Sequence, residues 1–96
     1  MRSVSLPGSF DITSVTAVRG ELLDAVRAGD LVLDASAVTR IDAAGLQLLY
    51  AAVTEARSRG VRVSWAGASA SVRDGARILG LAAALALPGA AATEVA

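Results

Sequence analysis

The sequence predicts one small α/β domain, in which helices pack on a mostly parallel or mixed sheet of about four strands. Short apolar or alternating runs take turns with longer segments whose apolar residues recur at helical spacing. Strands that alternate with helices favour a parallel sheet, because each helix returns the chain to the edge where the next strand begins. The 96 residues have room for one core. We expect a single domain over residues 1–96, with its core at about 2–88 and a frayed tail at 89–96.

The N-terminal segment predicts a strand followed by a helix. Residues Arg2 to Leu6 alternate between apolar and polar side chains, as a strand with one buried face does, and a Pro-Gly turn follows. We expect a helix to begin at Asp11 or Thr13 and to end at Gly29, with Ile12 as the first member of its buried stripe.

The middle of the chain predicts a second strand and a second helix. The apolar run Leu31 to Ala35 follows a glycine and is typical of a buried strand, whereas residues 36–40 form a connection. The next helix is expected to start close to Asp42 and Ala43 and to end at Gly60.

The last third predicts a strand, a helix and one further short strand. Residues Val61 to Ala66 alternate clearly. Ser69 or Ser71 is expected to cap a third helix that ends at Gly80. Residues Leu85 to Leu87 are predicted to add the last strand.

Composition restricts the classes of function. Nine Arg balance nine acidic residues. Because nucleic-acid binding needs a surplus of positive charge on one face, no nucleic-acid partner is expected. The chain lacks His and Cys, which removes the usual general base, thiol nucleophile and zinc ligands. We therefore expect a protein that is not an enzyme and that binds neither a metal nor a cofactor.

Neither membrane insertion nor secretion is expected. The longest stretch nearly free of charge is Ala-rich and interrupted by Pro88 and Gly89, whereas a spanning helix needs about 20 apolar residues. No apolar run precedes Pro7, so a secretory signal is not indicated. The absence of Cys agrees with a cytoplasmic location.

The segment Ile41-Asp42-Ala43-Ala44-Gly45-Leu46 carries the functional argument. An Asp at a helix start accepts free backbone N–H groups and complements the helix dipole. The two alanines are small, so another surface can lie close. A glycine in the first turn costs roughly 1 kcal/mol of helix propensity relative to Ala. That cost is easiest to understand if another backbone, or a partner, approaches there; an ordinary N-cap with a packing glycine is the alternative.

The run LVLDASAVTRIDAAGLQLL, residues 31–49, resembles the signature of STAS domains, the fold of anti-sigma factor antagonists. In that pattern an apolar strand with a terminal acid leads through a short loop to a D-[ST]-x-G-L helix start. The segment GVRVSWAG, residues 60–67, is similar to the family's next strand and its glycine, and residues 72–81 resemble its third helix.

The resemblance implies a non-catalytic, cytoplasmic module that docks protein partners through the start of the second helix. In regulatory members, which act in signalling and transcription regulation, an anti-sigma factor kinase phosphorylates the Ser or Thr just after the Asp. Ala43 stands at that position and Ala44 follows it. We therefore expect the phosphorylation site to be lost, either in a naturally unswitched member or through replacement of a Ser or Thr by Ala.

Three further residues are candidates for the same surface. Phe10 and Asp11 belong to a segment that resembles the family's G-E-L-D loop, which lies next to the second helix start. Phe10 is either an apolar contact or a core residue, and Asp11 either caps the first helix or meets a partner's cation. Tyr50 lies one residue off the buried stripe, and exposed aromatics are enriched at interfaces. The predicted partner-binding set is Asp42, Ala43, Ala44, Gly45, Leu46, Tyr50, Phe10 and Asp11.

The partner stays open among three proteins. Small STAS proteins that resemble this chain are accessory subunits of lipid-transporting ABC systems or stand beside chemotaxis proteins. An ABC-transporter ATPase or a chemotaxis kinase is therefore the alternative to an anti-sigma factor kinase. A nucleotide or small-molecule binder is disfavoured, because no G-x-x-x-x-G-K-[ST] loop is present. The family's first strand is expected to be missing, which leaves residues 2–6 near an edge where a homodimer could form.

Overall fold

The computed structural model describes residues 2–87, and every structural statement below refers to those residues. The chain forms helices and strands in alternation. In chain order they are β1 (Arg2–Ser5), β2 (Ser9–Phe10), α1 (Val15–Ala28), β3 (Leu31–Ala35), β4 (Arg40–Ile41), α2 (Ala43–Ser58), β5 (Val63–Ala68), α3 (Ala70–Ile78) and α4 (Ala82–Leu85). The predicted tail at residues 89–96 lies outside the described residues.

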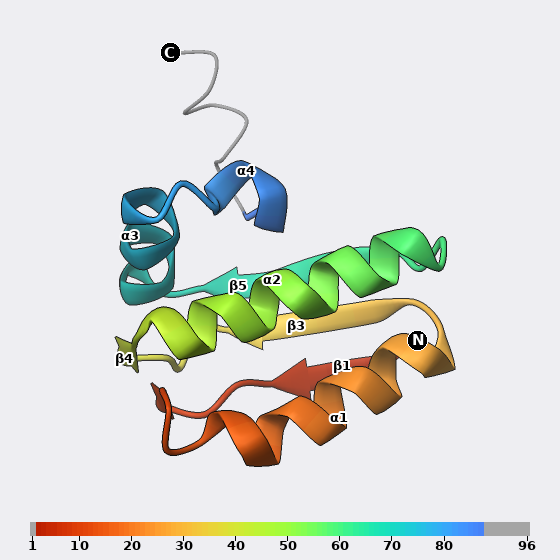
Figure 1. Cartoon of the computed structure of the whole chain (residues 1–96), viewed down its shortest axis with the longest axis horizontal. Coiled ribbons are helices and arrows are strands. Elements are labelled where there is room, and N and C mark those ends of the chain that lie inside the picture. The colour runs from red at the N-terminus through yellow and green to blue at the C-terminus, as the bar shows by residue number, and fades with distance from the viewer. Residues whose placement is uncertain (1, 88–96) are drawn as a thin grey trace.

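The main sheet has three parallel strands in the order β1-β3-β5 (Figure 1). Leu33 stands at its centre, opposite Val4 on one side and Trp65 on the other. A bulge follows between Leu33 and Asp34. A separate parallel pair joins β2 to β4. The expected parallel α/β fold is confirmed, and all strand pairs of the described part are parallel.

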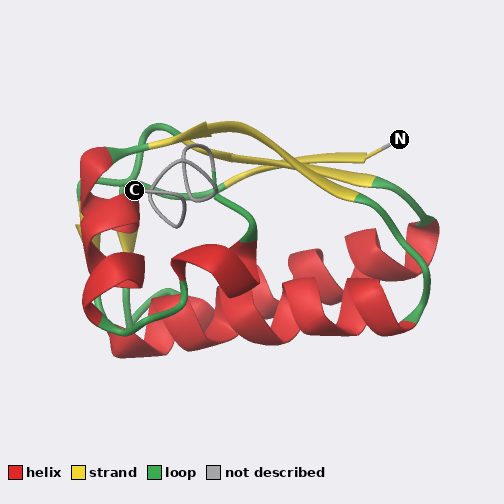
Figure 2. Cartoon of the chain, turned by 90° about the horizontal axis from the view of Figure 1, so that it is seen from above, coloured by secondary structure: helices red, strands yellow, loops and turns green. Residues whose placement is uncertain are grey.

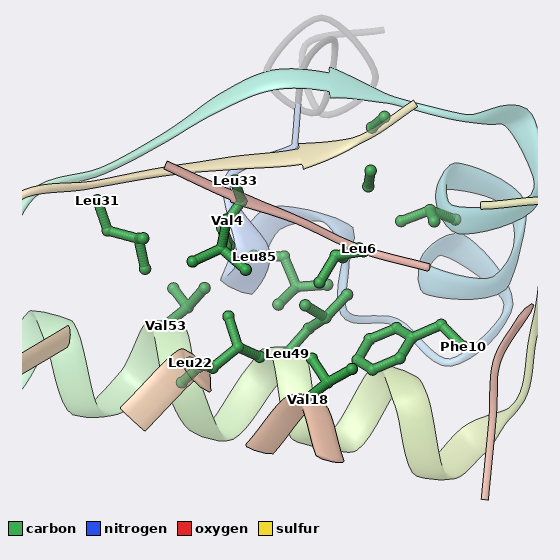
Figure 3. Packing of buried hydrophobic residues seen from close by; sticks show 14 of the residues in the cluster. Val4, Leu6, Phe10, Val18, Leu22, Leu31, Leu33, Leu49, Val53 and Leu85 are labelled. Atoms are coloured by element: carbon green, nitrogen blue, oxygen red, sulfur yellow. The ribbon is translucent and has the colours of Figure 1, made fainter. Parts of the chain in front are cut away.

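The three strands of the main sheet form one layer, and α1 and α2 lie side by side on one face of it (Figure 2). The third helix stands at the end of the sheet where the strands terminate (Figure 1). Apolar side chains from both layers meet in one core, and its fully buried members include Leu22 on α1, Leu33 on β3 and Leu49 on α2 (Figure 3). The core thus fixes the starts of α1 and α2 at the same end of the molecule.

Two of the predicted strands differ from the structure in their bounds or type. The strand expected at residues 61–66 runs instead from Val63 to Ala68. The strand expected at Leu85–Leu87 is absent, and α4 ends there at Leu85. Three consecutive alanines, which have the highest helix propensity, form most of this short helix. Leu85 and Leu87 are nevertheless buried, at 0% and 4% exposed. Ala86 between them has a left-handed backbone conformation, so the apolar pattern at residues 85–87 comes from a helix end and not from a strand.

Candidate functional site

The carboxylate of Asp42 joins the start of α2 to the segment before α1. Asp42 is the N-cap of α2, and its Oδ1 accepts the backbone N–H of Gly45 at 3.0 Å. Its Oδ2 accepts the backbone N–H of Ile12, also at 3.0 Å. One side chain therefore satisfies a free N–H of the helix start and holds the β2–α1 connection against it.

The β2–β4 pair places Phe10 beside this helix start. Phe10 pairs with Ile41, and the carbonyl of Gly8 accepts the N–H groups of Thr39 at 2.8 Å and Arg40 at 3.1 Å. These bonds bring the two connections at the ends of β1 and β3 together. The expectation that the Gly8–Asp11 loop lies next to the second helix start is thereby confirmed.

Gly45 is required by the closeness of β2. A Cβ at this position would overlap the carbonyl oxygen of Phe10 and would lie 3.2 Å from its carbonyl carbon and 3.1 Å from Ile41 Cγ1. Carbonyl backbone cannot yield as a flexible side chain can. Of the two explanations for a glycine in the first turn, close approach of another backbone is the one that holds here.

A polar turn precedes α1. Asp11 Oδ1 accepts both the backbone N–H of Thr13 at 3.0 Å and the Thr13 hydroxyl at 2.5 Å. The carbonyl of Asp11 accepts the N–H of Ser14 at 2.9 Å and that of Val15 at 3.0 Å. The Thr13 hydroxyl, then the Thr13 N–H, and more weakly the charge of Arg40, hold the pKa of Asp11 below its ordinary value of 3.8. Asp11 is therefore an anion that orders the turn.

An exposed face follows from this arrangement. Ala43, Gln47 and Tyr50 are exposed and lie at positions i, i+4 and i+7 of α2, which share one side of a helix. Ile12, held by Asp42, is 68% exposed, and Tyr50 is 42% exposed. We call these four residues the α2-start face.

The structure separates the predicted partner-binding residues into three groups by burial. Asp42, Ala44 and Asp11 are half-buried, whereas Ala43 and Tyr50 are exposed. Phe10, Gly45 and Leu46 were predicted to contact a partner and are buried instead. The ring of Phe10 is 0% exposed and points into the core (Figure 3), Leu46 is 3% exposed, and Gly45 is buried. These three shape the site from below and cannot offer a side chain to a partner.

Ile12 was placed wrongly by the helical pattern. Its spacing to Val15 and Leu22 fits a buried stripe, yet α1 begins only at Val15, with Ser14 as its N-cap. Asp, Thr and Ser at positions 11, 13 and 14 favour local turns over helix, because their side chains bond to nearby backbone groups. That cluster is the signal in the sequence that would have ended the helix before Ile12.

Within the described residues, the site is made of hydrogen-bonding and apolar groups. Within residues 2–87 there is no group of three or more acidic side chains, His or Cys placed to hold a metal ion. None of the helices in that range has the length and apolar character needed to cross a membrane.

The elements and their order define a small α/β domain. The family described as "Mlab, STAS domain" matches residues 2–88, and the chain belongs to this family. No curated protein matches the chain.

A solved structure entitled "Crystal Structure Analysis of Mglu" is similar to it, with a TM-score of 0.59 and 29% sequence identity. The match covers 69% of this chain and 17% of that one, so the chain corresponds to a small part of the larger protein. STAS domains are in general protein-interaction modules without enzymatic activity.

Proposed function

We propose that this chain is a non-catalytic interaction module, similar to anti-sigma factor antagonists, that binds a protein partner through the α2-start face. The observation that carries the proposal is the pairing of an exposed Ile12 with the exposed face of α2 through one carboxylate. Ile12 and Tyr50, which are large and exposed, supply the apolar part of the proposed surface.

We further propose that binding is not switched by phosphorylation. Ala43 is the first residue of α2 and is exposed, which supports its equivalence to the residue whose hydroxyl is modified in the regulatory pattern. A phosphate there would add about −1.5 to −2 charges beside a helix N-terminus and remake the surface without unfolding it. With Ala43 the same surface stays constant. Such constancy favours an accessory subunit as much as a regulated antagonist.

Three partners fit the proposal, all cytoplasmic: an anti-sigma factor kinase, an ABC-transporter ATPase of a lipid-transport system, and a chemotaxis kinase. An affinity capture from the native cell extract with the full chain as bait, followed by mass spectrometry, separates them. Ala43→Glu should abolish capture of the true partner, because a charge enters the centre of the face.

A matched control is Ala17→Glu. Ala17 is an exposed alanine near the start of α1, and an acid suits the start of either helix. Capture that survives Ala43→Glu and is lost with Ala17→Glu would contradict the proposed face. In addition, Ala43→Ser incubated with a captured kinase should gain phosphate on the peptide that contains position 43, whereas the natural chain should gain none there.

A further inference from the structure

A groove lies between β1 and α1, two elements that run side by side in Figure 1. Its volume is about 330 Å³. The residues that line it come from the strand and from the second half of the helix: Arg2, Ser3, Val4, Glu21, Asp24 and Ala25.

The edge of β1 offers unpaired backbone groups to this groove. In the described part of the chain, β1 pairs on one side only, with β3. Arg2 and Leu6 donate their N–H groups to Asp30 and Asp34, at 3.0 and 2.9 Å. Because alternate residues of a strand turn their backbone groups to opposite sides, Ser3 and Ser5 direct theirs to the free edge. Such an edge pairs readily with an extended segment.

The helix side of the groove is acidic. Glu21 and Asp24 lie three residues apart on one side of α1, and both are exposed. The ion pairs within residues 2–87 join Arg59 to Glu55 and Arg77 to Asp74, so neither groove acid is engaged in one. Between the acids and the strand the groove is closed by Val4 and Ala25, which are 2% and 0% exposed.

We propose that this groove receives an extended segment of a protein partner, which adds as a strand beside β1 and places a Lys or Arg side chain against Glu21 and Asp24. A residue paired opposite Val4 turns its side chain to the helix side of the sheet, as Val4 does. A long basic side chain suits that position, since its flexible stem lets the charged head reach the two acids on α1. The proposal concerns a second surface and is independent of the proposed function.

A second copy of the chain fits this edge poorly. The first helix lies outside β1 in Figure 1, so pairing two β1 strands about a two-fold axis would press α1 against its counterpart. Such pairing would also face Glu21 and Asp24 with the same acids of the other copy, and like charges repel. An isolated extended segment brings neither problem. The homodimer predicted at this edge is therefore the alternative occupant, and the experiment must distinguish it from the partner segment.

A tethered probe strand tests the proposal in the full chain. The probe Thr-Val-Thr-Lys-Thr-Glu-Thr is fused to the N-terminus through a Gly/Ser linker of about six residues, which permits antiparallel pairing at high effective concentration. In this register Lys stands opposite Val4, and Glu stands opposite Arg2. Hydrogen exchange followed by NMR should show the Ser3 and Ser5 amides slowed at least about tenfold relative to a Gly/Ser tether alone.

Three comparisons decide the outcome. Replacement of the probe's Lys by Glu, and the double variant E21Q/D24N, should each remove most of the protection, about threefold or more. Equal exchange with the probe and with the Gly/Ser tether would overturn the groove as a strand site. Protection that survives both charge changes would overturn the basic segment. A concentration-dependent dimer of the untethered chain that Ser3→Pro abolishes would assign the edge to a second copy instead; Pro at this position leaves the pairing with β3 in place.

Discussion

The Asp42 carboxylate accepts the backbone N–H of Ile12 at 3.0 Å, across thirty positions of the chain. This bond ties the turn before α1 to the N-terminus of α2, and the other oxygen caps the helix through Gly45. The backbones of two separate connections are therefore held together by one carboxylate. The predictions below test this construction and its use.

Replacement of Asp42 should destabilise the domain and release Ile12. Loss of an N-cap typically costs about 1 kcal/mol, up to about 2 kcal/mol, and the second hydrogen bond adds to it. We expect Asp42→Ala to lower the free energy of unfolding by about 1–3 kcal/mol in urea titrations. Asp42→Asn, which keeps one acceptor oxygen, should lose less.

The Ile12 amide should exchange its hydrogen faster in both Asp42 variants. Asp24→Ala is the control, because Asp24 is an exposed acid in the middle of α1 with no capping role. An Asp42→Ala variant that is no less stable than Asp24→Ala would show that the carboxylate does not hold the site.

Two glycine-to-alanine changes should have opposite effects. A Cβ at Gly45 would overlap the Phe10 carbonyl, so Gly45→Ala should cost about 1–3 kcal/mol of stability through overpacking. Gly20, in the exposed part of α1, has no atom within 4 Å of its added Cβ. Gly20→Ala should therefore stabilise the chain by about 0.5–1 kcal/mol. Thermal unfolding of the two variants gives the comparison, and a stabilised Gly45→Ala would refute the close approach.

Ile12 should matter for binding and hardly for folding. Its side chain is 68% exposed, so Ile12→Ser should leave the unfolding midpoint nearly unchanged. Burial of an isoleucine in a complex contributes roughly 1.5–3 kcal/mol, so affinity for the captured partner should fall at least about tenfold by calorimetry. Ile78→Ser is the matched control, because Ile78 is 79% exposed at the end of α3. Equal losses with both variants would exclude a specific role of Ile12.

The Asp11 turn should respond to acid. Hydrogen bonds from Thr13 lower the pKa of Asp11 below 3.8. A lowered pKa in the folded state means that the ionised form contributes stability above about pH 3.8, and that this contribution disappears as the pH falls through the lowered value. In Thr13→Val, NMR titration of the Asp11 carboxyl should show a midpoint shifted upward. An unchanged midpoint would mean that the Thr13 hydroxyl does not set this pKa.

Local chemistry predicted the centre of the site but not its surroundings. An Asp before two small residues is a helix cap in most settings, and Asp42 is one. Gly45 in a first turn indicated close approach, but only the resemblance of residues 8–11 to the family's loop, and not the residues around Gly45, pointed to Phe10 as the neighbour. Ile12 matched the helical spacing of α1, but this spacing carries no information on side-chain hydrogen bonds. The bonds from Thr13 to the Asp11 carboxylate form a turn, and the helix begins only after it, at Val15. Long-range pairings of this kind are decided by packing.

The Asp42 bridge also bears on the energetics and kinetics of binding. Because both connections are held before any partner arrives, little conformational entropy remains to be lost at the α2-start face when a complex forms. Association would then proceed as the docking of preformed shapes. Differences in affinity among partners would arise mainly from how slowly each complex comes apart.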